Sequence, residues 1–370
     1  MGYAPVIQAA LIGTAMVPMM AQPMHFQDPQ GFGAVAPPTD TFLGDARGVK
    51  KGGGGKGKCG GKCSQCLSGG YACHLNFYGE FLYLRARDAA VAFAVPIDGP
   101  ITAPPTPRVE VGPVAMVDMD FQPGFRAGLG INPNVCTQFT VEYSMFESGT
   151  TDNIAVPPAP SPFVLESLVQ HPSVSNAGSD FRLATAQYDI SFDMIDVAMH
   201  RLLSYSCSHQ FGYSLGIRYA QHEQTFQADF SVTGTETVTT DIDFDGVGVR
   251  GGLEFEQYVG CRMLVYAKGY GSLMPGEFRA SYLQSQSFDT RVINTTWRAG
   301  RVMTMWDLEL GLGLSSKCKN YRATAGYVFS AWTNMLQTDE WIRGVHNNDF
   351  IGMEDTTTFD GLVARFEARY

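Results

Sequence analysis

A strict alternation of apolar and polar residues over one long segment constrains this chain more than any other feature. The segment Arg301–Leu314 reads RVMTMWDLELGLGL. Its even-numbered positions carry Val, Thr, Trp and Leu, and its odd-numbered positions carry Arg, Met, Asp, Glu and Gly. A period of two places these sets on opposite faces of an extended strand, so the chain must build a sheet with two unlike faces.

Two kinds of protein use such a strand. A soluble protein buries the apolar face in a core, whereas a membrane β-barrel turns it toward lipid and keeps charged and small residues inside. The alternation alone does not separate the two, so length, loops and composition must decide.

Composition excludes other classes. The 370 residues include 12% aromatic residues, 17% charged residues and 41 glycines. Beyond the N-terminus no run of about 18 apolar residues occurs, so we expect no transmembrane helix. The net charge of −10 argues against a nucleic-acid partner, because phosphate binding requires a basic face.

The alternation predicts ten strands. They lie near residues 76–95, 111–131, 135–148, 178–200, 208–232, 236–257, 260–283, 290–315, 318–334 and 358–370. Every second connection is a tight turn, whereas the others are longer or polar, and 149–177 and 337–357 are long and irregular. Short turns at one rim and long loops at the other are typical of outer-membrane barrels.

We therefore predict an all-β fold, a transmembrane antiparallel up-and-down barrel of about ten strands, with eight to twelve allowed, over residues 76–370. Strands of a soluble sandwich would be shorter, at about five or six residues. An even strand number places both barrel termini at the rim of short turns.

The first 75 residues differ in character. Residues 1–21 are largely apolar and predict a signal peptide, although the first basic residue is Arg47. Residues 22–75 form a Gly-, Lys- and Cys-rich tract that we expect to be a flexible linker. We expect the lysines of Lys50–Lys62 to be part of this solvated linker, with contact to anionic cell-wall or lipid groups as the alternative. The remaining residues hold 20 basic and 33 acidic side chains.

The last strand, Gly361–Tyr370, alternates and ends the chain on an aromatic residue. This pattern resembles the signal by which barrel-assembly machinery recognises its clients, which makes that machinery an expected partner along with outer-membrane lipid. Homo-oligomerisation stays open.

Several segments, in the same order, resemble the Legionella-type major outer membrane protein family of pore-forming barrels. They are Tyr78–Asp88, Phe125–Gly130, Gly216–Ala220, Trp306–Leu314, Ala325–Trp332 and Gly361–Tyr370. The resemblance implies an outer-membrane location and a porin role over about residues 76–370.

Charged residues on the polar faces are expected to line the lumen, because a charge on the lipid face costs about 2–4 kcal/mol for Arg or Lys at mid-bilayer. They are Glu80, Arg126, Glu142, Asp189, Asp193, Asp196, Arg218, Arg250, Glu254, Asp307, Glu309, Arg365, Glu367 and Arg369. In the fourth strand the apolar residues change phase, which predicts a β-bulge near Asp193–Met194 that turns Asp196 and His200 inward.

Two interpretations of these charges stay open. They can pair and fill the lumen, since about eight strands enclose a space that side chains fill, or they can conduct. In a conducting barrel the acidic excess favours cations.

The cysteines show a pattern of their own. The rim of short turns, which we expect to be the periplasmic one, carries Cys73, Cys136, Cys207, Cys261 and Cys318. We hypothesise that disulfides staple this rim, either within itself or to the N-terminal tract. Cys59, Cys63 and Cys66 lack the spacing of a paired zinc motif, so no metal or other cofactor is expected.

No catalytic motif accompanies the seven histidines, and we predict that the protein is not an enzyme. The predicted function is a passive outer-membrane pore for ions or small polar solutes. The first alternative is a structural or adhesive envelope barrel with a side-chain-filled lumen, and the second is a soluble exported β-protein.

Overall fold

A computed structural model describes residues 75–370, apart from 100–108, 135, 159, 175–179, 207, 233, 261, 288 and 317–319. The chain divides into two units, residues 1–56 and 57–370, and every described residue belongs to the second. The predicted signal peptide, nearly all of the predicted linker, and Lys50–Lys62 lie outside the described residues.

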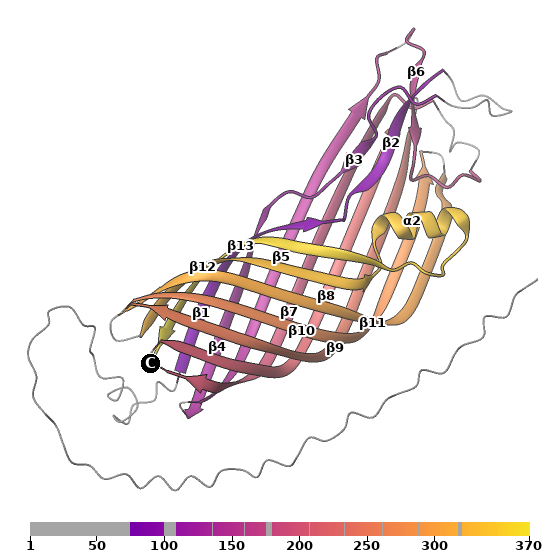
Figure 1. Ribbon diagram of the computed structural model, residues 1–370. Coiled ribbons are helices and arrows are strands. Elements are labelled where there is room, and N and C mark those ends of the chain that lie inside the picture. The colour runs from indigo at the N-terminus through magenta and orange to yellow at the C-terminus, as the bar shows by residue number, and fades with distance from the viewer. Residues whose placement is uncertain are drawn as a thin grey trace, which may run out of the picture. The chain divides into compact units, whose positions relative to one another are not determined.

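Ten antiparallel strands close into a barrel in the order β1-β13-β12-β11-β10-β9-β8-β7-β5-β4 (Figure 1). This confirms the predicted fold and strand number. The bounds are β1 Leu75–Arg87, β4 Gln122–Asn134, β5 Thr137–Ala155, β7 Leu183–Tyr205, β8 His209–Ser231, β9 Thr235–Val259, β10 Met263–Gln286, β11 Asp289–Ser315, β12 Tyr321–Met335 and β13 Asp355–Arg369.

Both ends of the barrel sequence meet at one rim, where Leu75 and Tyr370 exchange backbone hydrogen bonds of 3.1 and 2.9 Å. The connections β4–β5, β7–β8, β9–β10 and β11–β12 are short and lie at this rim. At the opposite rim only three connections are long, because β8–β9 and β10–β11 also close in short turns.

The first two predicted strands each divide in two. The predicted strand 76–95 breaks at Asp88, whose φ of 59° turns the chain, and continues as β2 (Val91–Asp98) outside the barrel. The predicted strand 111–131 becomes β3 (Ala115–Val117), a short loop and β4. β2 lies between β3 and β6 (Phe163–Ser167) in a separate three-stranded sheet.

The polarity of the barrel wall inverts partway along the strands. In β8 the outward residues Leu215, Ile217 and Tyr219 are apolar, and the next outward residues, Gln221 and Glu223, are polar. The inward residues change in the opposite sense, from polar near the short-turn rim to apolar beyond it. One half of the wall therefore suits lipid outside, and the other half suits water outside with a hydrophobic core inside.

The predicted β-bulge near Asp193–Met194 is wrong. The pairing of β7 runs in unbroken register past both residues on β5 and on β8. The apolar phase changes because Ile190 and Phe192 face a buried core, whereas Ile195 and Val197 face outward in the apolar belt. The same face of β7 therefore stays inward along the whole strand. Apolar residues lie on its inner face in one half of the strand and on its outer face in the other half.

A cap fills the end of the barrel opposite the C-terminus. It consists of the sheet β3-β2-β6 and helix α2 (Thr338–Asn347), which Figure 1 shows at that end. Asp339 and Glu340 occupy the first turn of α2, where negative charge suits the helix dipole, and Asn348 ends the helix in the left-handed conformation. Among the described residues, no helix has the length and apolar character needed to cross a membrane.

Candidate functional site in the barrel lumen

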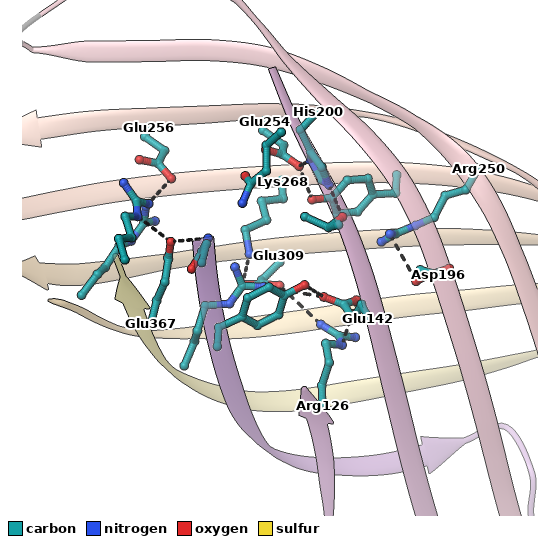
Figure 2. A pocket seen from close by; sticks show the side chains of 18 residues that line it. Arg126, Glu142, Asp196, His200, Arg250, Glu254, Glu256, Lys268, Glu309 and Glu367 are labelled. Atoms are coloured by element: carbon teal, nitrogen blue, oxygen red, sulfur yellow. Dashed lines mark hydrogen bonds and ion pairs between the residues drawn. The ribbon is translucent and has the colours of Figure 1, made fainter. Parts of the chain in front are cut away.

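The inner wall nearest the short-turn rim encloses a polar cavity of about 100 Å³, here called the lumen chamber (Figure 2). Its lining residues are Asn76, Tyr78, Arg126, Gln138, Thr140, Glu142, Asp196, His200, Arg250, Glu254, Glu256, Lys268, Tyr270, Glu309, Arg322, Arg365, Glu367 and Arg369. Side-chain exposure rises from 0% at Glu80, behind the chamber, to 32% at Arg369 by the rim. Water therefore reaches the chamber from the short-turn rim.

A first ion-pair group centres on Glu80. The strand register places Glu80 of β1 directly between Arg126 of β4 and Arg365 of β13. Arg126 donates to the Glu80 carboxylate at 2.9 Å, and Arg365 donates to its other oxygen. Tyr78 donates its hydroxyl to Glu142 at 2.5 Å, so the neighbouring carboxylate also has a partner.

A second group centres on Arg218, which is only 1% exposed. Its guanidinium donates to Asp196 at 2.7 and 2.9 Å and to Asp307 at 2.9 Å. Arg250 adds a 3.2 Å contact to Asp196. Asp307 belongs to β11 and Arg218 to β8, three strands away, so this group spans the lumen.

The remaining charges pair nearer the rim, as the dashed lines of Figure 2 show. His200 and Tyr270 contact the Glu254 carboxylate at 2.8 and 2.7 Å. Lys268 donates to Glu309 at 3.0 Å. Further contacts are Arg322 to Glu256 at 2.6 Å, and Asn76 and Arg369 to Glu367 at 2.8 and 2.6 Å.

An aromatic layer closes the inner end of the chamber. It consists of Phe146, Phe192, His222, Trp332 and Phe359, each at most 4% exposed. Their rings touch in a continuous set of contacts with centroids 4.8 to 6.3 Å apart. The hydrophobic core continues beyond this layer to the cap, where Trp341 of α2 is fully buried. In this conformation the polar chamber ends blindly at the aromatic layer.

Twelve of the fourteen predicted lumen residues lie on the inner face. Asp189 and Asp193 do not: they lie on the outer face of β7, where Asp193 accepts a 2.5 Å hydrogen bond from the Tyr143 hydroxyl. The assignment failed because these two residues occupy the half of the wall whose outside is polar. An outward charge there costs little, so the rule for the lipid face does not apply.

Sequence reasoning missed Tyr78, Glu256, Lys268 and Arg322 as lumen residues. Tyr78 and Glu256 have the same strand parity as the assigned residues Glu80 and Glu254, so continuing the alternation by two positions would have found them. Lys268 of β10 and Arg322 of β12 had no such neighbour, because no residue of those strands was assigned to the lumen. The aromatic layer gave no such signal, because an inward Phe in a barrel strand has the sequence appearance of a lipid-facing one.

The acidic excess does not line the chamber. Its lining includes six carboxylates and six Lys or Arg side chains, so their formal charges balance. Acidic side chains instead gather on the polar outer wall, for example Glu223 of β8 and Asp241, Asp243 and Asp245 of β9. The sequence argument for cation preference, which rested on net charge, therefore loses its basis.

Of the predicted rim cysteines, only Cys136 lies within the described residues, and it is a free thiol there. Cys73, Cys207, Cys261 and Cys318 lie outside them, so the disulfide hypothesis gains no support at Cys136 and stays untested elsewhere. The described part of the chain holds no group of three His, Cys, Asp or Glu side chains that could bind a metal ion.

The comparisons with known proteins place this geometry in context. The family model described as Legionella pneumophila major outer membrane protein precursor matches residues 72–360. No curated protein matches the chain significantly. Among solved structures, the outer membrane protease OmpT from Escherichia coli gives a TM-score of 0.43 at 8% identity, over 80% of this chain and 97% of that one. The Pseudomonas putida toluene transporter TodX gives 0.29 at 7%, over 81% and 90%.

Proposed function

Because the chain belongs to the family of the Legionella pneumophila major outer membrane protein, and so is a barrel of the cell outer membrane, we propose that it is a structural envelope barrel with a closed lumen. The single observation that carries the proposal is the contact between Phe192 and Trp332 across the lumen, with ring centroids 5.2 Å apart. This role requires no catalytic step.

The ion pairs support the same role. A barrel that conducts needs side chains that leave room for water and ions, whereas here the inward charges contact one another across the lumen. Arg126 of β4 approaches Glu309 of β11 within 3.9 Å, although four strand intervals separate the two strands. Such contacts tie the walls together, and the hydrophobic core beyond them excludes water.

Conductance measurements test the proposal directly. Full-length protein is refolded and inserted into a planar bilayer, with heat-modifiable migration on a denaturing gel as the check that the barrel has formed. We expect no discrete conductance steps. Regular steps from the heat-modifiable fraction, absent after boiling, would contradict a closed lumen.

A passive pore is the second candidate, and the lumen chamber favours it. The chamber gives ions and small polar solutes an entry from the short-turn rim, and the family resemblance implies a porin role. In this case the cap and the hydrophobic core beneath it would have to move aside for solute to pass. Steps that appear only under applied voltage or after loss of the cap would support this candidate over the first.

A further inference from the structure

A second, smaller cavity of about 30 Å³ lies between the lumen chamber and the aromatic layer. Apolar side chains form its roof, namely Leu82, Leu84, Phe192, Met194, Val328, Trp332 and Phe359. Polar side chains form its floor, and Arg126, Arg250, Tyr270 and Glu309 line the lumen chamber as well. The small cavity is therefore the inner end of the space that opens at the short-turn rim.

The charged side chains at the floor of this cavity compensate one another, but one hydrogen-bond donor among them is unused. Arg126 and Arg250 face Asp307 and Glu309, so a charged ligand would find no uncompensated charge. The Arg250 side chain is only 10% exposed, and its terminal nitrogens lie 3.2 Å from Asp196 and 4.0 Å from Asp307. Its Nε–H, in contrast, is buried and has no hydrogen-bond partner among the described residues. A buried donor in that state costs free energy and favours an oxygen acceptor.

We propose that this cavity binds a small neutral amphipathic molecule, a short-chain alcohol in the simplest case, with its oxygen on Arg250 and its hydrocarbon end under Trp332. The apolar roof removes the chain from water, and the hydroxyl oxygen accepts the unused hydrogen bond. Charged relatives of the same length bind less well, because their charge leaves water without compensation. The site does not depend on whether the lumen conducts.

The size of the cavity limits the ligand. A water-sized group needs roughly 10–15 Å³ of such volume, so the roof accommodates about two groups above the one at the floor. Each methylene that enters the roof is expected to tighten binding about fourfold. The gain should therefore stop after about two carbons, when the roof is full.

Fluorine NMR of the full chain labelled with 5-fluorotryptophan tests the proposal. The chain has four tryptophans, and each signal is assigned through a Trp→Phe variant. Trp332 lies in the roof, whereas Trp306 faces outward in the apolar belt and is 57% exposed. Methanol, ethanol, 1-propanol and 1-butanol are titrated into the refolded barrel. We expect a saturable shift at Trp332 and only a linear, partition-driven shift at Trp306.

Matched probes and variants separate the site from solvent effects. Acetate and ethylammonium should shift Trp332 less than ethanol does. Val328→Phe and Leu84→Phe fill the roof from β12 and β1 and should abolish the saturable shift. Ala325→Phe adds the same ring on the outer face of β12 and should leave the shift unchanged.

Three results would overturn the proposal. One is a Trp332 shift that never saturates in the folded wild type. Another is a saturable shift that persists in both filled variants. The third is a response to acetate or ethylammonium equal to that of ethanol, which would place binding in the charged chamber rather than under the apolar roof.

Discussion

Phe192 and Trp332 stand on strands that lie opposite each other in the ring of ten, and the centroids of their rings are 5.2 Å apart. Aromatic side chains from facing walls thus meet in the middle of the barrel. They contact one another as residues of a soluble core do, with tilted and edge-to-face geometry.

The aromatic layer should therefore behave as a core. Phe192→Ala is expected to lower the free energy of unfolding by about 3–5 kcal/mol, because it leaves a cavity that the facing wall cannot fill. Guanidinium unfolding in lipid vesicles measures the loss. Phe139→Ala is the control, since Phe139 faces outward and is 51% exposed. If both variants lower the free energy of unfolding equally, the contact of Phe192 with Trp332 across the lumen does not stabilise the barrel.

Loss of the buried charge of Arg218 should lower the free energy of unfolding by as much as loss of the Phe192 ring. Arg218→Gln removes the partner of Asp196 and Asp307, and losing one side of a buried ion pair costs about 3–5 kcal/mol. Arg298→Gln serves as the control, because Arg298 pairs with Glu277 while 69% exposed, and such surface pairs contribute about 0–1 kcal/mol. The same unfolding assay applies. If Arg218→Gln lowers the free energy of unfolding no more than Arg298→Gln does, the ion pairs of Arg218 with Asp196 and Asp307 do not determine stability.

The inversion of wall polarity predicts where the lipid ends. Leu308 lies in the apolar belt of β11, so Leu308→Arg should lower the free energy of unfolding in vesicles by about 2–4 kcal/mol. Gln227→Arg lies on the polar outer wall of β8 and should change stability by less than about 0.5 kcal/mol. If both cost the same, the polar part of the wall is also embedded, and the boundary drawn from β8 is wrong.

Helix α2 should loosen as the pH falls below neutrality. Burial lowers the pKa of His346 below its usual 6.5, with a further contribution from the nearby His171. The folded state then binds fewer protons than the opened state, so the stabilisation present above pH 6.5 is lost as the pH falls toward the folded pKa. The protection factors of the α2 amides, which are their exchange rates relative to the intrinsic rate at each pH, measure this between pH 7.5 and about pH 5.5, since the ordinary pKa lies near the middle of that window.

The control for this prediction is His346→Gln, which should flatten the profile in that window. Burial raises the pKa of Asp339 and Glu340 on the same helix. Their contribution has the opposite sign: it is present below their ordinary pKa and lost as the pH rises through the raised value. Protection factors that rise on acidification through pH 6 would mean that these carboxylates, not His346, dominate.

The sequence predicted the barrel and its strand number because alternation is a local property of each strand. The break at Asp88 escaped notice, since a left-handed non-glycine residue leaves little trace in the pattern. The phase change in β7 was visible but was attributed to the backbone, whereas its cause is the exchange of environments along an unbroken strand.

The pairing inside the lumen was beyond sequence reasoning for a different reason. Which charges meet depends on the register between strands, and a shift of two residues would keep every side chain on its face while changing every partner. Glu80 contacts both Arg126 and Arg365 only because all three lie at the same height. The faces could thus be derived from one strand at a time, but the network could not.

The polar half of the wall has a consequence for any macromolecule that meets the barrel on that side of the membrane. From Gln221 to the end of β8 this wall spans about eleven residues, or roughly 35 Å measured along the strand. The polar part of the wall is therefore a hydrogen-bonded sheet of β5 and β7 to β11 rather than a fringe of loops, because the pairing of β11 with β12 stops at Thr304 and that of β1 with β13 stops at Arg87. A macromolecule that docks on this sheet would meet an acidic surface whose shape is held by backbone hydrogen bonds.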